Sequence, residues 1–348
     1  MKVSRTVPAT QALATSIEPQ PVQKLVDEAA LIDAIDGASS SGPLGKPVAG
    51  GTSARSAYWT TDVPARSYGE IQAVARALVG APGAAASKAV GLALLPSRQA
   101  GSSDVIRALA QADLSSLRQA GVRTVATLDF DNTLVPGDTF VAFCDHLAKH
   151  LVDVGRVDDG TALARSVAEH VSGALPAKDM LRIGIASFTG FTVDELSTLA
   201  RAMFTSYIGN AFDHGADNSA RSLVRELTDA GIEPFVVSAG MRFLGQVGAE
   251  LLGIPRDNAF GGELAVDDTG RCTGALALDV ASIGKAAVIK DQIGTPPVFA
   301  FGDSPGSDAP MLAEAIVQGF MINPSEKFLL KAKDESLPYV AMVWRAPA

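Results

Sequence analysis

The sequence predicts an α/β protein with a doubly wound parallel sheet, a helical cap inserted after the first strand and a β-hairpin flap. Two observations support this fold class. Short apolar runs of strand length alternate with segments of helical periodicity, which is typical of a parallel sheet covered by helices on both faces. Several of the apolar runs are followed directly by acidic or hydroxyl residues. Such sheets bind ligands at the carboxyl ends of their strands, so we expect the functional site there.

The composition and charge restrict the function classes. The chain has 348 residues, 47% of them hydrophobic, which is enough to bury a full core and to form more than one unit. Its formal net charge of -9 argues against nucleic acid and anionic membranes as partners, because both bind basic surfaces. No apolar run approaches the roughly 18 residues that cross a bilayer. The first residues lack the apolar segment of a secretory signal, so we expect a cytoplasmic protein that acts on a small molecule.

Residues 1–102 form a low-complexity N-terminal region rich in Ala, Gly, Ser and Pro, which we expect to be partly disordered or loosely docked. Apolar residues at helical spacing predict two short helices within it, at 21–35 and 68–78. A further helix is expected to begin with Ser103 as its N-cap and to end at Gly121. None of these segments carries recognisable chemistry.

The elements that follow are expected to build a catalytic core from residues 103–139 and 213–348. Strands are predicted where short apolar runs occur, and helices where apolar residues recur on one face. The strands are expected at 122–128, 232–237, 297–301 and 320–322, and the helices at 217–230, 242–252 and 309–315.

Two insertions interrupt this alternation. The segment between Asp131 and Ser238 is too long for a simple crossover, and its residues 140–212 are expected to form a helical cap over the end of the first strand. Residues 258–277 contain two short alternating segments around a Gly-containing turn, which predicts a β-hairpin flap.

The first strand ends in an Asp-x-Asp-x-Thr motif formed by Asp129, Asp131 and Thr133. Because side chains alternate along a strand, the two carboxylates are expected on the same side, with Thr133 opening the following loop. A nucleophile and a proton donor would then lie together. Taken alone, the motif also fits an acidic turn that only solvates the loop.

A second acidic pair, Asp303 and Asp308, follows the strand expected at 297–301. Converging carboxylates repel one another unless a cation offsets their charge. A hard divalent metal with oxygen ligands does so and also binds phosphate. We therefore expect Mg²⁺ as the cofactor.

Two further positions extend the pattern. Ser238, followed by Ala239 and Gly240, ends another predicted strand and offers a hydroxyl and backbone N–H groups to phosphoryl oxygens. Alone, Ser238 equally fits a helix N-cap. Lys285 begins a helix between the flap and the last acidic strand, a position where a single lysine is usually a surface residue.

The sequence resembles the haloacid dehalogenase superfamily of phosphohydrolases in the order of four features. These are an Asp pair, a strand-end Ser, a helix-start Lys and a Gly-Asp acidic loop. The resemblance covers about residues 104–344. The run 131–139, the helical insertion, the Thr-Gly flap and the closing run 319–324 look like the phosphoserine-phosphatase-like branch. The resemblance implies an Mg²⁺-dependent enzyme that hydrolyses a small phosphomonoester through an aspartyl-phosphate.

The resemblance also implies roles for individual residues. Asp129 would attack phosphorus, and Asp131 would protonate the leaving oxygen and then activate water. Ser238 and Lys285 would hold the transferring phosphoryl group and spread its charge.

The same resemblance implies a metal site. The carboxylates of Asp129 and Asp303 and the backbone carbonyl of Asp131 would ligate Mg²⁺, while Asp308 would orient a ligand water or Lys285. Asp303 and Asp308 are five positions apart rather than four, a spacing that the superfamily also tolerates.

Substrate contacts are expected from Thr133, Asp138, Arg182 and the segment 238–240. Arg182 lies in the cap and is the candidate to meet an anionic substrate group, although a surface Arg is the simpler interpretation. Phosphoserine phosphatases place a Glu seven residues beyond the second Asp, where this sequence has the shorter Asp138. Phosphoserine is therefore not the preferred substrate.

Two alternative functions stay open. A phosphotransferase or mutase would form the same aspartyl-phosphate and pass it to an acceptor other than water. A secreted effector or interaction protein would use residues 1–102 as a delivery signal for a non-classical secretion system, or as the binding surface for a protein partner.

Overall fold

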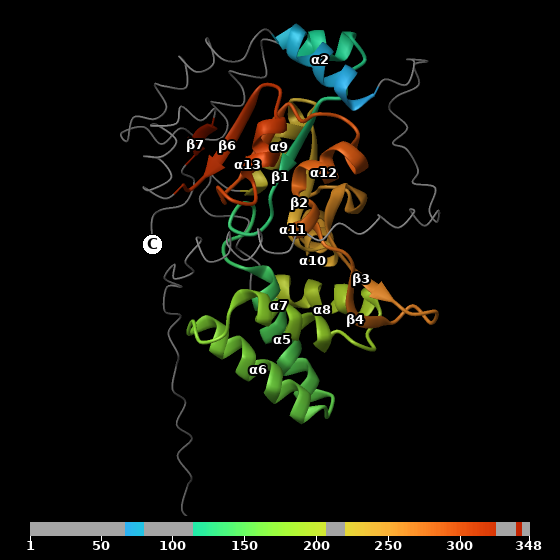
Figure 1. Ribbon diagram of the computed structural model, residues 1–348, viewed down its shortest axis with the longest axis vertical. Helices are drawn as coiled ribbons and strands as arrows, with labels where there is room; N and C mark the ends of the chain where they lie inside the picture. The colour runs from blue at the N-terminus through green and yellow to red at the C-terminus, as the bar shows by residue number, and fades with distance from the viewer. Residues whose placement is uncertain (1–66, 80–113, 207–219, 325–338, 343–348) are drawn as a thin grey trace, which may run out of the picture.

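The computed structural model describes residues 67–79, 114–206, 220–324 and 339–342 (Figure 1). Several predictions lie outside these residues, among them the helix at 21–35, the Ser103 N-cap and the end of the cap at 207–212. None of the helices in the described ranges has the length and apolar character needed to span a bilayer.

A seven-stranded sheet forms the centre of the molecule, with the strand order β4-β3-β2-β1-β5-β6-β7. Neighbouring strands are parallel throughout, except that β4 is antiparallel to β3. All four residues of the central strand β1 are buried, as expected for a parallel strand covered on both faces. The strands are β1 (Val125–Leu128), β2 (Glu233–Met241), β3 (Ala259–Val266), β4 (Cys272–Leu278), β5 (Phe299–Gly302), β6 (Gln318–Ile322) and β7 (Tyr339–Met342).

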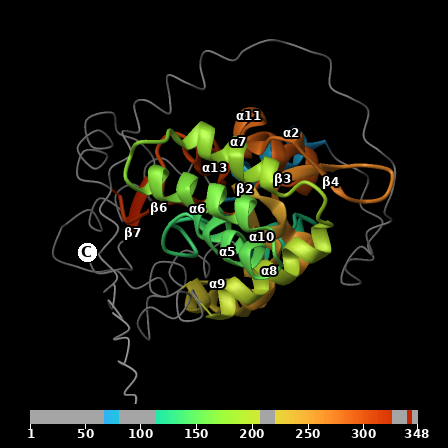
Figure 2. The same ribbon diagram turned by 90° about the horizontal axis from the view of Figure 1, so that it is seen from below.

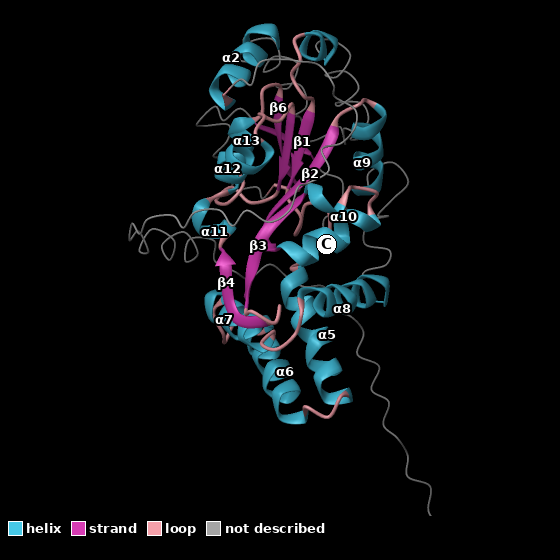
Figure 3. Cartoon of the chain, turned by 90° about the vertical axis from the view of Figure 1, so that its right-hand side faces the viewer, coloured by secondary structure: helices cyan, strands magenta, loops and turns pink. Residues whose placement is uncertain are grey.

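Helices cover both faces of this sheet, which confirms the predicted doubly wound α/β fold (Figure 3). On one face lie α9 (Ala220–Asp229) and α10 (Arg242–Leu251). On the other lie α11 (Val280–Ile283), α12 (Lys285–Val288), which a wider turn over Ile289–Ile293 continues, and α13 (Ala309–Glu314). The sequence did not predict β7, and β2 runs beyond its expected end at Val237.

In the described part of the chain, four helices lie between β1 and α9 and form the predicted cap, below the sheet in Figure 1 and in front of it in Figure 2. An edge-to-face cluster of phenylalanine rings joins these cap helices to the core. Phe143 of the cap contacts Phe243 of α10, with 5.1 Å between ring centroids. Phe188, which follows α7, packs against both rings. The cap helices are α5 (Thr139–Asp153), α6 (Val157–Val171), α7 (Ala177–Ser187) and α8 (Val193–Ser206).

The hairpin of β3 and β4, also as predicted, is paired with the cap by backbone hydrogen bonds. Gly190 donates to the carbonyl of Cys272 over 2.9 Å, and Cys272 donates to the carbonyl of Phe191 over 2.7 Å. Arg271, next to this pairing, donates to the carbonyl of Gly190 over 2.5 Å. The cap and the hairpin are therefore one hydrogen-bonded unit, which the sequence did not predict.

The expected helix at 68–78 is present as α2 (Tyr68–Val79), at the end of the molecule away from the cap (Figure 1). It is not loosely docked. Ala75 is fully buried and belongs to the same core cluster as Leu114 and Leu117. Part of the N-terminal region therefore belongs to the folded core.

Candidate active site

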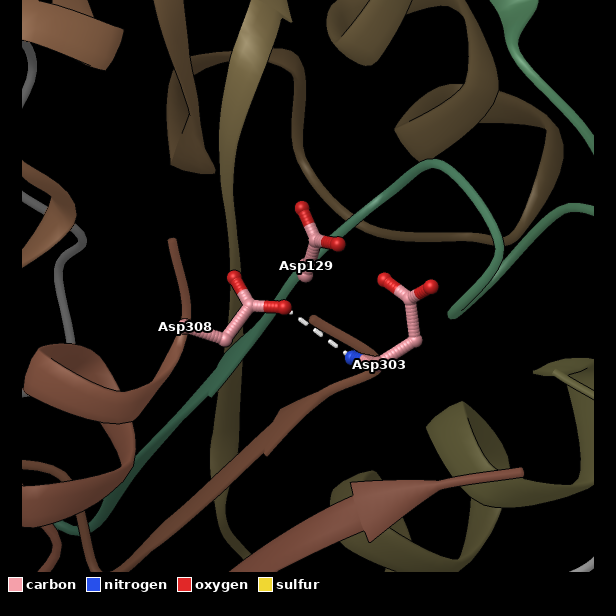
Figure 4. Close-up of side chains that lie close together, drawn as sticks. All are labelled: Asp129, Asp303 and Asp308. Atoms are coloured by element: carbon pink, nitrogen blue, oxygen red, sulfur yellow. Dashed lines mark hydrogen bonds between the residues drawn. The ribbon is translucent and has the colours of Figure 1, made fainter. Parts of the chain in front are cut away.

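Asp129 and Asp303 meet because the strands that precede them are neighbours in the sheet. Asp129 follows β1 directly and Asp303 follows β5, and these strands pair in parallel with Leu128 opposite Phe301. The backbone N–H of Asp129 continues this pairing by donating to the carbonyl of Phe301 over 2.8 Å. Figure 4 shows the resulting group of side chains at the carboxyl end of the sheet.

Three carboxylates gather in this group. Asp129, Asp303 and Asp308 each offer an oxygen, and these oxygens all lie within 4.8 Å of one another. Burial and the charge of Asp308 raise the pKa of Asp129 to about 6. Burial and the charges of Asp129 and Asp308 raise the pKa of Asp303 to about 9. A buried cluster of carboxylate oxygens is the donor set that a hard cation such as Mg²⁺ prefers, so these residues fit the predicted metal.

Lys285 supplies a positive charge inside this cluster. Its Nζ atom donates to Oδ1 of Asp129 and to Oδ1 of Asp308, each over 2.5 Å, and its side chain is 3% exposed. Burial by itself lowers the pKa of Lys285, but the charges of the two carboxylates outweigh burial and raise it. Lys285 is therefore a protonated, buried residue at the site rather than a surface lysine.

Asp308 is fully buried, and both of its carboxylate oxygens are engaged. Oδ1 accepts from Lys285, while Oδ2 accepts from the backbone N–H groups of Asp303 and Ser304 over 3.0 and 2.9 Å. A Cβ atom at Gly302 would lie 2.6 Å from Asp308, so only glycine fits there. Asp308 fixes the loop that carries Asp303 and also holds Lys285.

Asp131 lies beside the same group and faces β2. Its Oδ1 accepts the backbone N–H of Thr139, the first residue of α5, over 2.9 Å. Burial and the charge of Asp138 raise the pKa of Asp131 to about 7. A Cβ atom built on Gly240 would lie 3.2 Å from both Oδ2 of Asp131 and Oγ of Ser238, so β2 approaches Asp131 at these residues.

Ser238 is 2% exposed, and its Oγ accepts the backbone N–H of Gly240 over 2.9 Å. The pairing of β2 with β3 shifts register between Val237 and Met241, which corrects the expected strand end at 237. The serine therefore lies within an irregular part of the strand and not in a helix N-cap. On the other side of the group, Thr133 Oγ1 donates to Oδ2 of Asp129 over 3.3 Å.

The sequence model of the family described as haloacid dehalogenase-like hydrolase matches residues 126–313, more than half of the chain. This chain belongs to the haloacid dehalogenase-like hydrolase family. The predicted superfamily is thereby confirmed, and the matched range includes Asp129, Ser238, Lys285 and Asp303. No curated protein matches the chain.

Solved structures similar to this haloacid dehalogenase-like hydrolase include a protein of unknown function from Bordetella pertussis Tohama I. It is 20% identical, with a TM-score of 0.48, and the match covers 64% of this chain and 98% of the other. A phosphoserine phosphatase, solved as a phospho-aspartyl intermediate analogue, is 19% identical over 64% of this chain and 94% of its own, with a TM-score of 0.39. A phosphoserine phosphohydrolase-like protein from Francisella tularensis is 18% identical over 63% and 94%, with a TM-score of 0.39.

Two of the predicted substrate contacts of this haloacid dehalogenase-like hydrolase have local partners of their own. Asp138 is the N-cap of α5 and accepts the backbone N–H of Val141 over 3.0 Å. Arg182 lies on α7 with its side chain 74% exposed, 3.9 Å from Asp179. Their contact with a substrate stays a prediction.

Two residues that shape the site lie in predicted motifs, but the sequence analysis gave neither of them a role. Gly302 allows the close approach of Asp308. A glycine at the end of a strand, directly before Asp303, is a sequence signal for such a close approach. Thr139 supplies an N–H group to Asp131. Asp138 followed by an apolar helical stretch is an N-cap signature, so the start of α5 and its free N–H groups were recognisable in the sequence.

Proposed function

We propose that this chain is an Mg²⁺-dependent phosphatase that hydrolyses a small phosphomonoester through an aspartyl-phosphate intermediate. The observation that supports the proposal is the convergence of Asp129, Asp131, Ser238 and Lys285 at the carboxyl ends of neighbouring strands. One site then contains a nucleophile, a proton donor and groups that bind anionic oxygens, as phosphoryl transfer requires.

In the first half of the reaction a carboxylate oxygen of Asp129 forms a bond to phosphorus while the bond from phosphorus to the substrate oxygen breaks. Asp131 gives its proton to the departing oxygen, so the alcohol leaves in neutral form. The pKa of Asp131, raised to about 7, suits this role because a useful share of the side chain is protonated near neutral pH.

In the second half Asp131, now a carboxylate, takes a proton from a water molecule. The water oxygen bonds to phosphorus and the bond from phosphorus to Asp129 breaks, which releases phosphate and restores both side chains. The same residue acts as acid and then as base, so no further proton carrier is needed.

The transferred group carries negative charge that the site has to offset. Lys285 and the hydroxyl of Ser238 are the cationic and hydrogen-bonding groups beside Asp129 and Asp131. The carboxylates of Asp129 and Asp303 and the backbone carbonyl of Asp131 would hold Mg²⁺. When bound, Mg²⁺ offsets charge on the phosphoryl oxygens and the carboxylates.

The test is a phosphate-release screen over a broad panel of phosphomonoesters, with Mg²⁺ present and no other acceptor. We expect free phosphate from at least one ester, abolished in Asp129→Asn and after chelation. Asp145→Asn, the same change at an α5 residue paired with Lys149, is the matched control and should keep full activity. Turnover by Asp129→Asn at the wild-type rate would contradict the proposal. Consumption of an ester only when an acceptor alcohol is added, with the phosphoryl group recovered on that alcohol and not as free phosphate, would indicate a phosphotransferase.

A further inference from the structure

The two short helices that carry Lys285 and Asp308 are joined by ion pairs at both ends. At the active-site end, Lys285 begins α12 and lies 2.5 Å from Asp308, the N-cap of α13. At the far end, Lys290 in the continuation of α12 lies 2.8 Å from Glu314, the last residue of α13. The second ion pair therefore joins the two helices about one and a half turns from the first.

Glu314 also binds the N-terminal helix α2. Its Oε1 is held by Lys290, while its Oε2 accepts the phenolic O–H of Tyr68 over 2.9 Å and the side-chain N–H of Gln72 over 3.0 Å. Burial and the bond to Glu314 raise the pKa of Tyr68, so the phenol stays protonated and donates. The carboxylate of Glu314 thus connects α2, α12 and α13, and its side chain is only 13% exposed.

Apolar packing supports the same junction. Tyr68 packs against a buried cluster to which α12 contributes Val288 and α13 contributes Met311 and Leu312. Figure 3 shows α2 beside these helices, at the end of the sheet opposite the cap. Helices as short as α12 and α13, with four and six residues, do not hold their conformation alone, so their orientation depends on such contacts.

We infer that Glu314, together with Tyr68 of the N-terminal helix, is a positioning residue that holds Lys285 and Asp308 in place for the reaction. The inference rests on the proposed function for its catalytic consequence, but its structural content does not. Asp308 accepts the N–H groups of Asp303 and Ser304. A shift of α13 would therefore loosen the loop that carries Asp303.

The experiment uses the full-length chain and the variants Glu314→Gln and Tyr68→Phe, each of which keeps the side-chain shape. The matched control is Glu250→Gln, because Glu250 also joins two basic side chains, Arg201 and Arg256, but lies on α10. Hydrogen–deuterium exchange of the peptide that spans residues 302–308 reports the two N–H groups bound by Asp308. The exchange is measured without metal or substrate. In a second measurement, calorimetry gives the Mg²⁺ concentration for half-maximal binding.

We expect exchange in this peptide to become about three- to tenfold faster in both variants, the scale of one lost hydrogen bond of ordinary net strength. The half-saturating Mg²⁺ concentration should rise by a similar factor, and kcat should fall while KM changes little. Glu250→Gln should alter none of these, even if its melting temperature drops. If Glu314→Gln does not fold, Tyr68→Phe decides.

Unchanged exchange and Mg²⁺ binding in Tyr68→Phe and in folded Glu314→Gln, with only a lower melting temperature, would overturn the inference. Exchange and Mg²⁺ binding are measured without turnover. A chain that hydrolyses no phosphoester would therefore contradict the proposed function and leave this test in force.

Discussion

Lys285 Nζ lies 2.5 Å from Oδ1 of Asp129, although 156 positions separate the two residues in the sequence. Both side chains are almost completely buried. Buried charges are stable only when they are paired, and here one ammonium group faces Asp129 and Asp308 together. The remaining negative charge is what a bound cation would offset.

Replacement of Lys285 by Met should both destabilise the fold and abolish turnover. The variant leaves two buried carboxylates without their cation, which costs about 3–5 kcal/mol in the free energy of unfolding at neutral pH. Urea unfolding measures this loss. Lys149→Met is the control, because Lys149 pairs with Asp145 on the surface and such pairs contribute only about 0–1 kcal/mol. Equal effects of the two substitutions would contradict the assignment.

Asp131→Asn should separate the two halves of the proposed reaction. An aryl ester with a good leaving group does not need protonation, so the variant should still form the aspartyl-phosphate from p-nitrophenyl phosphate in a burst. It should fail on alkyl phosphates and hydrolyse the intermediate slowly, because no base activates water. Stopped-flow release of p-nitrophenolate measures the burst. Equal steady-state losses on aryl and alkyl esters, without a burst, would exclude Asp131 as the proton donor.

Gly302→Ala should destabilise the protein, because the added Cβ would lie 2.6 Å from the side chain of Asp308. Overpacking of this kind costs about 1–3 kcal/mol, and here it would also displace the loop that carries Asp303. The matched control is Gly69→Ala in α2, where a Cβ atom meets nothing within 4 Å and should stabilise the helix by up to about 1 kcal/mol. Thermal unfolding of both variants decides, and a stable, fully active Gly302→Ala would refute the close contact.

The stability of the metal-free protein should fall as the pH rises. The pKa of Asp129 is raised to about 6 and that of Asp303 to about 9 in the fold, so the folded chain retains protons that the unfolded chain releases near pH 4. Between about pH 4 and pH 9 the folded state binds more protons than the unfolded state, so the free energy of unfolding decreases as the pH rises.

Added Mg²⁺ should remove this decrease, because the cation takes the place of the protons among the carboxylates. The measurement is the melting temperature with Mg²⁺ minus that with EDTA, across the same pH interval. The difference should widen with pH in the wild type and much less in Asp303→Asn. A difference that stays constant with pH would show that these carboxylates do not bind the metal.

Arg271→Ala should loosen the joint between the cap and the hairpin. Arg271 donates to the carbonyl of Gly190 and lies 3.7 Å from Glu195, both in the cap. Because the residue is exposed, we expect global stability to change by less than about 1 kcal/mol. Hydrogen–deuterium exchange should rise locally at 190–192 and 271–272. Arg165→Ala, an exposed arginine on α6, should leave these peptides unchanged. Unaltered exchange in Arg271→Ala would mean that the backbone pairing alone holds the joint.

The strand ends that carry Asp129 and Asp303 were predictable because the signals for them are local. An apolar run followed by acidic residues needs only the alternation of strand side chains and the preference of ligands for one sheet edge. The end of β2 was not predictable in the same way. Its continuation to Met241 depends on pairing with β3, and Ser238 alone reads equally well as a strand end or a helix cap.

The N-terminal region shows the same limit. Helical spacing identified α2, but low complexity around it suggested loose docking. In the structure Ala75 is fully buried and Tyr68 binds Glu314, a residue 246 positions away. The composition of a segment indicates how readily it is solvated. It does not indicate which distant part of the chain a short helix in that segment packs against.

By itself the sequence determined the α/β alternation, the insertion of helices after the first strand and the acidic residues at two strand ends. These features follow from periodicity and turn residues, which act over a few positions. Only the tertiary structure decided that Lys285 lies between Asp129 and Asp308, that the hairpin pairs with the cap and that Glu314 joins three helices. Such contacts depend on strand order and on how helices pack across the sheet, and no short-range pattern encodes either.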